Sequence, residues 1–488
     1  MLFKTLELIT IIVYSSAILY LFVFSLSQIH LTWAYINKRK KENKASFSGS
    51  HKPKVTIQLP LFNEPTVAQR LLEQVVKIQY PFELLEIQVL DDSTDETSDL
   101  ITNVIAQLPV NLNIKHIQRA NRMGFKAGAL KEGLKTAEGE LVAIFDADFL
   151  PQPDFLVKTV GFFINENLGV VQTKWGHLNE DYSLLTKTQA FGLDAHFSVE
   201  QKGRNVEDCF ISFNGTAGIW RKNCIEDAGG WQSDTLTEDL DLSFRAQLRG
   251  WKFLFLEDVI SPAELPITVA AYKSQQYRWN KGAAETHVKL WKKVKRSSIP
   301  FKIKAHALMQ LFKGLGFIAS FVLTITSIPI LYFKSTGSIT NTTMQVLSLS
   351  LLCIVALVMF YLASAISHKN SRKRGLIKFI KEFPSFIALS LGTTLHNALA
   401  VIEGYIGIKT PFVRTPKFNI SNENKVVALG NITWLTFIEG VLAVYFVFGV
   451  FLSFKLFDFT FLPFHILLFL GYGYFFMYSI AQRFNWAK

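Results

Sequence analysis

Long apolar runs lie near both ends of this chain and are missing from its middle. Each run is long enough to cross a bilayer, which takes about 20 predominantly apolar residues. The runs occupy residues 7–36, 306–333, 344–367, 430–454 and 461–482. Residues 51–300 contain no comparable run. The pattern therefore predicts about five membrane spans and one large domain between the first span and the others.

Basic residues beside these runs predict the orientation of the chain. The sequence NKRKKENK directly follows the first run, and the strongly basic SHKNSRKRGLIKFIKEF follows the third. Lys and Arg next to a span remain in the cytosol, so we expect the N-terminus outside and the large domain in the cytosol. The formal net charge of +12 collects beside the spans. The same rule explains this charge, and no nucleic-acid partner is expected.

One apolar segment does not fit a simple crossing. Residues 384–408 carry His396, Asn397 and Glu403, and basic stretches flank the segment on both sides. If both flanks are cytosolic, the segment lies in the membrane interface as an amphipathic helix, within a region of about 376–408. A single crossing is the alternative.

The pattern divides the chain into three parts. We expect an N-terminal transmembrane helix, a cytosolic domain and a C-terminal membrane region, at residues 1–40, 50–300 and 301–488.

Within the predicted cytosolic domain, short β-branched runs alternate with helical patterns. The strand-like runs are residues 54–60, 85–92, 113–120 and 139–149. The order βαβαβαβ predicts a mostly parallel sheet in an open α/β fold. Ligands of such sheets bind at the carboxyl ends of the strands.

Acidic residues follow two of these strands. Asp91 and Asp92 follow the second, and Asp146 and Asp148 follow the fourth. Two alternating carboxylates at a strand end can hold Mg²⁺, which favours carboxylate and phosphate oxygens. The cation would make a bound diphosphate a better leaving group. The alternatives are a solvated turn for the D-x-D and a helix N-cap for Asp91 and Asp92.

Several familiar sites are absent from the sequence. It contains neither the G-x-G-x-x-G of dinucleotide folds nor the P-loop of NTPases. Its three cysteines, Cys209, Cys224 and Cys353, are too widely spaced for a zinc site or a disulfide framework. We interpret them as small buried hydrophobic residues.

Four motifs occur in one order within the large domain. They are Asp91-Asp92, DAD (146–148), TED (237–239) and QQYRW (275–279). This ordered set resembles the membrane-embedded, processive family 2 glycosyltransferases, which include cellulose synthase-like enzymes. FNGTAGIWRK and RGWKF are most similar to the mannan and glucan synthase branch. The resemblance implies a glycosyltransferase A-type sheet inserted between transmembrane helices.

The resemblance also implies roles for particular residues. Asp239 would be the general base that deprotonates the acceptor hydroxyl, giving inversion in one displacement. Asp146 and Asp148 would hold Mg²⁺ or Mn²⁺. The implied nucleotide-sugar ligands are Asp91, Asp92, Lys126, Asp146, Asp148, Gln275 and Arg278. The implied acceptor ligands are Phe213, Asn214, Gly215, Thr216 and Trp279.

Simpler interpretations remain for some of these residues. Lys126 also fits an ordinary lysine at a helix start, and Trp279 fits a membrane-interface anchor. Thr237 is expected to cap the helix that carries Asp239, and Asp241 to complement the dipole of that helix.

The sequence FVRTPK (412–417) resembles the gating loop of these synthases. The loop would cover about residues 409–426, and Thr415 and Lys417 would contact the diphosphate. The alternative is a basic cytosolic loop without a catalytic role.

The resemblance implies an integral membrane synthase. It would polymerise a β-linked glucan or mannan from UDP-glucose or GDP-mannose and pass the growing polysaccharide through its spans, in contact with membrane lipid. The membrane would be the cell or inner membrane in a bacterium and the Golgi membrane in a eukaryote. One alternative is a non-processive, ceramide-type glycolipid glucosyltransferase, whose product carries a single sugar. The other is a non-catalytic scaffold or transporter, against which the intact acids argue.

Overall fold

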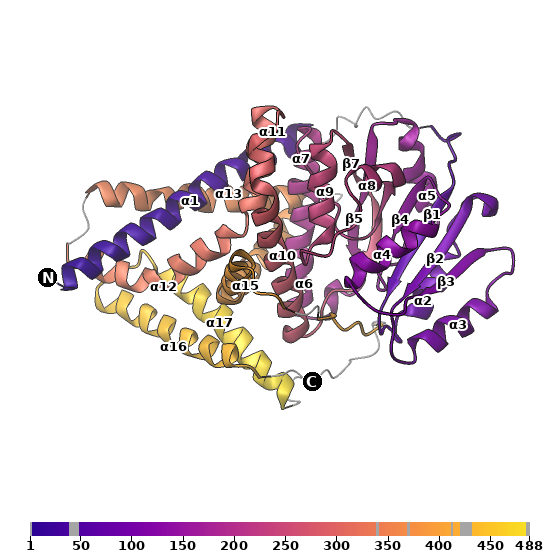
Figure 1. Ribbon diagram of the computed structural model, residues 1–488. Helices are drawn as coiled ribbons and strands as arrows, with labels where there is room; N and C mark the ends of the chain where they lie inside the picture. The colour runs from indigo at the N-terminus through magenta and orange to yellow at the C-terminus, as the bar shows by residue number, and fades with distance from the viewer. Residues whose placement is uncertain are drawn as a thin grey trace.

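The computed structural model describes residues 2–38, 48–337, 341–367, 371–410, 413–419 and 432–484. Figure 1 shows an elongated molecule with a sheet domain at one end and a bundle of long helices at the other. Two further helices, α10 (Val269–Arg296) and α15 (Thr394–Ile406), lie between these parts.

The sheet has seven strands within the described residues, in the order β3-β2-β1-β4-β6-β5-β7. The strands are β1 (Val55–Leu61), β2 (Leu85–Asp91), β3 (Asn113–Gln118), β4 (Leu141–Ile144), β5 (Leu168–His177), β6 (Gly218–Arg221) and β7 (Lys252–Ala263). All neighbours pair in parallel except β6, which is antiparallel to both β4 and β5. The predicted mostly parallel sheet is confirmed.

The four predicted strands are β1 to β4, joined by crossover helices. Alternate residues of β4 enter different cores: Leu141 and Ala143 pack on one face of the sheet, and Val142 and Ile144 on the other. A strand that is apolar on both faces belongs in the middle of a covered sheet. The chain leaves β4 at the carboxyl edge of the sheet, where Asp146 follows.

Shorter helices cover the sheet and connect it to the bundle. The α-helices are α2 (Ala68–Val75), α3 (Thr97–Gln107), α4 (Phe125–Thr136), α5 (Phe155–Thr159), α6 (Leu184–Ala195), α7 (Gly203–Val206), α8 (Lys222–Asp227), α9 (Glu238–Leu248) and α11 (Phe301–Phe312). The other helical turns are η1 (Phe82–Leu84), η2 (Val160–Ile164), η3 (Glu180–Tyr182) and a π-helix, η4 (His196–Lys202).

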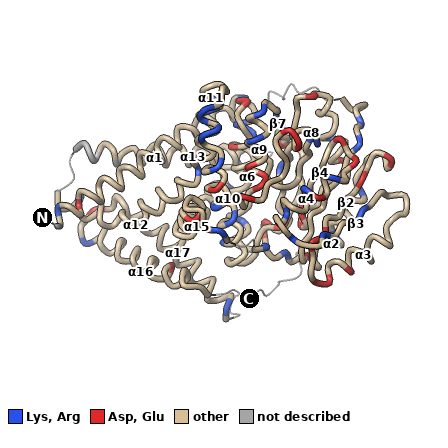
Figure 2. The backbone as a smooth tube through the Cα atoms, in the orientation of Figure 1, with Lys and Arg blue, Asp and Glu red and all other residues tan. Residues whose placement is uncertain are grey.

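Within the described residues, five helices are long and apolar enough to cross a membrane. They are α1 (Leu2–Lys38), α12 (Leu315–Ser335), α13 (Asn341–Ser367), α16 (Trp434–Lys455) and α17 (Leu462–Arg483). Figure 2 shows few charged residues along these helices and many on the sheet domain and around α10 and α11. The number agrees with the spans predicted from the sequence.

The segment 384–408, whose placement the sequence leaves open, belongs to two helices. The first, α14 (Arg372–Gly392), meets α15 at a bend of 49°, and the pair together is apolar enough for a sixth span. His396 of α15 lies 2.9 Å from the backbone oxygen of Lys273 on α10. The segment therefore packs against the helix that carries Gln275, Arg278 and Trp279. Interfacial placement and a crossing both remain predictions.

Candidate active site

The carboxyl edge of the sheet opens into a cleft whose other wall is α10. The lining includes Asp92, Lys126, Asp146, Asp148, Asn214, Gly215, Asp239, Gln275, Arg278, Trp279, Thr415 and Lys417. Of the predicted site residues that the structure describes, all line the cleft except Asp91, Phe213 and Thr216. The four motifs, which are spread from Asp91-Asp92 to Trp279 along the sequence, therefore meet at one place.

Lys126 connects the D-x-D to the FNGTAG loop. Its amine donates to Asp146 Oδ1 at 2.5 Å and to the Gly215 backbone oxygen at 2.8 Å. Although burial acts in the opposite direction, the carboxylates of Asp146, Glu238 and Asp239 raise the pKa of Lys126. The lysine is therefore a permanent cation in the middle of the cleft, which fits binding of phosphate oxygens.

Asp239 lies at the start of α9, beside Gly215. A Cβ on Gly215, whose φ is +80°, would stand 3.0 Å from Asp239 Oδ2, so only glycine allows this approach. The resemblance implies that Gly215 contacts the acceptor, and in the structure the Asp239 carboxylate is its close neighbour. Burial and the adjacent Glu238 carboxylate raise the pKa of Asp239 to about 7. A carboxylate with such a pKa suits proton transfer near neutral pH.

Of two expectations about α9, the cap by Thr237 is wrong, whereas Asp241 lies in the first turn as expected and is also paired with cations. Thr237 makes no capping hydrogen bond through its side chain; its hydroxyl lies 3.2 Å from that of Thr286 on α10. Asp241 is fully buried and forms ion pairs with Arg245 at 2.7 Å and Lys289 at 2.9 Å. The turn is held by packing against α10 and by these ion pairs.

The two acids at the end of β2 have different surroundings. Asp91 is 2% exposed and accepts hydrogen bonds from Ser93 N at 2.9 Å and Ser98 Oγ at 2.5 Å, with His116 Nε2 at 2.9 Å. Burial alone would raise the pKa of Asp91, but these hydrogen bonds hold it below its ordinary value. Successive strand residues point to opposite faces, so Asp92 reaches the cleft instead. Arg119 binds the Asp92 carboxylate there, with its Nε 2.8 Å from Oδ1.

Phe213 and Thr216 support the cleft from behind. Phe213 is fully buried and packs edge-on against Trp220, with ring centroids 5.4 Å apart. The Thr216 hydroxyl accepts a hydrogen bond from the Asp146 backbone nitrogen at 2.9 Å. It therefore fixes the first acid of the D-x-D by its backbone. Neither residue lines the cleft.

Asn214 faces the cleft and is fixed from the π-helix. Gln201 donates to its Oδ1 at 2.8 Å, and its Nδ2 lies 3.2 Å from His196 Nε2. His196 Nδ1 in turn lies 2.8 Å from the carboxylate of Glu200, which is buried beside Arg204. π-Helices often occur at functional sites. The sequence motif predicted Asn214 but not these supporting residues.

One face of α10 forms the wall opposite the D-x-D. Gln275, Arg278 and Trp279 all line the cleft, as their i, i+3, i+4 spacing requires. Trp279 lies next to Trp175 of β5, with ring centroids 6.4 Å apart. Sequence analysis did not select Trp175; the only signal was its place in QTKWGHLN, after a strand-like run.

The segment 413–419 crosses the mouth of the cleft. Arg278 donates to the Thr415 hydroxyl at 2.7 Å, and the Lys417 amine donates to Asp148 at 2.6 Å. Arg414 lies 2.6 Å from Glu64, which follows β1 and was not predicted. Burial raises the pKa of Glu64 to about 7, against the effect of Arg414. Of the predicted gating loop, residues 411–412 and 420–426 lie outside the described residues.

Comparison with known proteins names the domain that holds this cleft. Residues 53–282 match the family model described as "Glycosyltransferase like family 2". These residues are a family 2 glycosyltransferase domain. The resemblance inferred from four short motifs is confirmed for these residues.

Plant mannosyltransferases are among the relatives of this glycosyltransferase domain. The chain is 42% identical over 295 residues to glucomannan 4-beta-mannosyltransferase 2 of Arabidopsis thaliana, which covers 58% of this chain and 55% of that protein. It is 43% identical over 248 residues to glucomannan 4-beta-mannosyltransferase 1 of Cyamopsis tetragonoloba, covering 50% and 47%. The matched part of the chain thus spans about half the length of these relatives. They agree with the expected likeness to the mannan synthase branch.

A solved structure shares the fold of much of this chain. It is a mannosyltransferase from Pyrobaculum calidifontis in complex with GDP-Man and Mn²⁺. The TM-score is 0.55 at 19% identity, over 72% of this chain and 98% of that one. At this identity the likeness supports the fold alone.

The D-x-D of the glycosyltransferase domain fits a divalent cation. Asp146 and Asp148 supply hard carboxylate oxygens, and each carboxylate already binds a cationic amine, from Lys126 and Lys417. Among the described residues, no group of three or more His, Cys, Asp or Glu side chains is arranged to hold a metal. Two carboxylates alone suit an ion that keeps substrate phosphates and water as its other ligands.

Proposed function

We propose that this chain is a membrane-embedded, inverting glycosyltransferase that extends a β-linked polysaccharide of the mannan or glucan type. The observation that carries the proposal is the single cleft shared by Asp239, the D-x-D and the Gln275-Arg278-Trp279 face of α10. GDP-mannose is the first donor to test because the similar plant proteins are mannosyltransferases. UDP-glucose is the second.

The donor would lie along the sheet side of the cleft. Asp92 would hold the base and ribose end, next to Arg122, which also lines the cleft. Lys126 and Arg278 would bind the diphosphate. Burial lowers the pKa of Arg278, but nearby carboxylates favour its charged form. Its guanidinium can bind two phosphate oxygens at once. Mg²⁺ or Mn²⁺ on Asp146 and Asp148 would neutralise the charge of the leaving diphosphate.

The acceptor would approach from the Trp279 side. Its sugar ring would lie on the indole of Trp279, and the Asn214 amide, fixed by Gln201 and His196, would bind an acceptor hydroxyl. Asp239 would then take the proton of the attacking hydroxyl. A new bond forms from that oxygen to the anomeric carbon while the bond to the diphosphate breaks. Attack from the face opposite the diphosphate inverts the anomeric centre.

The segment 413–419 would close over a bound donor. In the present arrangement Lys417 binds Asp148 and Arg278 binds Thr415. Donor binding would transfer Asp148 to the cation and leave Lys417 for the diphosphate. Two charged groups therefore change partners within one cleft, which links donor binding to movement of the segment.

Contacts between α10 and the long apolar helices support a synthase that passes its product across the membrane. α10 is tied to the membrane helices by Lys273, whose amine binds both oxygens of Glu439 on α16 at 2.6 and 2.7 Å. Glu403 of α15 accepts a hydrogen bond from Tyr277 of α10. The acceptor wall of the cleft is thus continuous with the helices that would form a path for the polymer. The sheet domain would face the cytosol, where nucleotide-sugars occur.

The direct test uses the purified chain in lipid with a panel of nucleotide-sugars and Mg²⁺ or Mn²⁺. We expect a polymer from GDP-mannose, or from GDP-mannose with GDP-glucose or UDP-glucose, that a β-1,4-specific mannanase digests. A product with one sugar on a lipid would favour the glycolipid enzyme instead. No transfer from any donor would reject the proposed function.

A further inference from the structure

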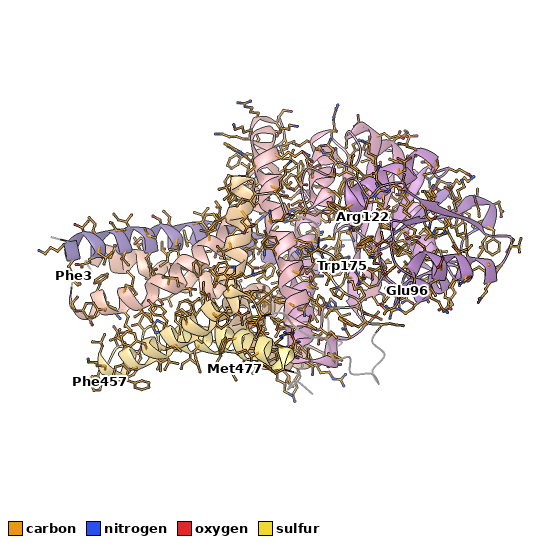
Figure 3. The ribbon with its side chains drawn as sticks, turned by 60° about the horizontal axis from the view of Figure 1, so that its bottom comes forward. Phe3, Glu96, Arg122, Trp175, Phe457 and Met477 are labelled. Atoms are coloured by element: carbon orange, nitrogen blue, oxygen red, sulfur yellow. The ribbon has the colours of Figure 1, made fainter. Side chains whose placement is uncertain are left out.

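A second tryptophan enlarges the apolar end of the cleft. Trp175 lies near the end of β5, after a shift in register between β5 and β7, and lines the cleft next to Trp279. Its ring packs on Phe149 and Phe197, with centroid separations of 5.3 and 5.2 Å. Figure 3 shows Trp175 where the long helices meet the sheet domain. Phe149 and Phe197 hold the ring, and its remaining surface belongs to the cleft.

Two buried ring nitrogens at this end have no hydrogen-bond partner among the described residues. They are Trp175 Nε1 and His177 Nε2, on side chains that both line the cleft. The nearest carboxylate to His177 Nε2, that of Asp194, is 3.6 Å away, beyond hydrogen-bond length. A buried polar group without a partner destabilises a protein, and native structures contain few. Both nitrogens therefore point to a polar ligand in the cleft.

This end of the cleft faces the helices of the membrane region. Leu193 of α6 lines it, and the neighbouring Asp194 lies 3.7 Å from Lys378 of α14. The phosphate-binding cations Lys126 and Arg278 interact instead with Asp146 and Thr415 on the donor side. At the Trp175 end the Asp194 carboxylate is already paired with Lys174 at 3.2 Å and with Lys378. We therefore take a ligand there to be polar and uncharged, next to the Trp279 platform.

We propose that Trp175 and His177 form a second acceptor subsite, for the sugar ring preceding the one on Trp279. The subsite rests on the proposed function, because it takes the chain end that Asp239 activates. The indole offers an apolar face to the ring, and the two nitrogens bind its hydroxyl oxygens. Flat aromatic surfaces with a few fixed polar groups are typical of specific ligand sites. A lipid acyl chain would leave both nitrogens without partners.

The consequence is a dependence of transfer on acceptor length. A monosaccharide occupies the Trp279 platform only, whereas a disaccharide also reaches Trp175. In the wild type we expect KM for a β-linked disaccharide to be roughly tenfold lower than for a monosaccharide, as one added set of polar and apolar contacts implies. A trisaccharide should improve on the disaccharide by much less.

The test compares acceptors of one, two and three sugars in Trp175→Leu, Trp175→Phe and His177→Leu. We expect Trp175→Leu to raise KM for the disaccharide roughly tenfold and KM for the monosaccharide by much less, so that the advantage of the disaccharide is lost. Trp175→Phe keeps the packing but loses the N–H, so it should give a smaller rise, as should His177→Leu. Trp251→Phe is the control, since Trp251 donates to Asp227 on the surface, outside the cleft.

The outcomes separate this inference from the proposed function. If the wild type transfers sugar but the Trp175 variants raise KM equally for all acceptors, or for none, the subsite is wrong. If the wild type transfers nothing from any donor, the proposed function itself fails. Should Trp175→Leu not fold, Trp175→Phe decides, and an unchanged KM for the disaccharide in that variant rejects the subsite.

Discussion

Asp239 shares the start of α9 with a second carboxylate, Glu238, in a cleft that restricts water. Burial raises the pKa of both groups, and the negative charge of Glu238 raises the pKa of Asp239 further. Lys126 partly offsets this effect. In the donor-free protein Asp239 therefore carries a proton over much of the acidic range, and a protonated Asp239 cannot act as a base.

The first prediction concerns the pH dependence of transfer. Because the pKa of Asp239 is raised to about 7, kcat/KM should fall as pH decreases through that value. Glu238→Gln removes a neighbouring negative charge and should move the acidic limb toward lower pH. The measurement is the pH profile of kcat/KM for both proteins. An identical acidic limb in the variant would contradict the coupling of the two carboxylates.

The second prediction separates the adjacent acids of β2. Asp91→Ala leaves buried donors from Ser93, Ser98 and His116 without an acceptor, so it should lower Tm by roughly 5–10 °C. Asp92→Ala should instead weaken GDP-mannose binding, since Asp92 lines the cleft. Thermal unfolding and donor titration of both variants test this division. The reverse pattern would show that Asp91 is the donor ligand.

The sequence predicts that these acids occur at a strand end but not which of them faces the cleft. Strand alternation gives opposite directions to Asp91 and Asp92, yet the apolar residues of β2 are buried on both faces and do not mark the open side. The decision depends on His116, which comes from β3 and contacts Asp91 only after the sheet has formed. A local sequence pattern does not contain information about long-range contacts of this kind.

At the scale of elements, α10 and the segment 413–419 hold the two walls of the cleft together. The segment contacts Asp148 through Lys417, Arg278 through Thr415 and Glu64 through Arg414. These partners come from the turn after β4, from α10 and from the loop after β1. A loop that binds both walls can change with the ligand between them.

The third prediction tests the competition at Asp148. The Lys417 amine occupies the carboxylate that would hold a divalent cation, so Lys417→Gln should tighten Mn²⁺ binding to the donor-free protein roughly tenfold. Lys409→Gln, a matched change at an exposed lysine before the segment, should have no effect. Mn²⁺ titration followed by electron paramagnetic resonance measures both. Equal affinities in Lys417→Gln and the wild type would contradict the competition.

The elements of the sheet were predictable in unequal degree. β1 to β4 follow from local runs, because each is a short apolar strand followed by a helical pattern. β6 has four residues, Gly218–Arg221, and is a strand only because β4 and β5 pair with it on either side. β7 is interrupted by Glu257 and Asp258, which breaks its apolar pattern. Trp175 was not predicted as a site residue because its strand, β5, was not predicted from the sequence.

At the scale of the whole molecule, one polar domain is joined to an apolar bundle through α10 and α15. Ion pairs such as Lys273–Glu439 are buried where the two parts meet. Breaking a buried pair costs several kcal/mol, so the parts should move as one body near the cleft. The apolar runs predicted the candidate spans from the sequence, because a run of about 20 apolar residues is typical of a membrane span. The bend between α14 and α15 was not predicted.

The most direct test of the account separates donor binding from sugar transfer at Asp239. The central claim is that Asp239 accepts the proton of an acceptor held in the same cleft as the D-x-D and Trp279. Asp239→Asn, purified in lipid, is predicted to bind GDP-mannose within about threefold of wild type and to lose transfer by roughly a hundredfold to ten-thousandfold. Transfer at the wild-type rate in that variant would contradict the claim.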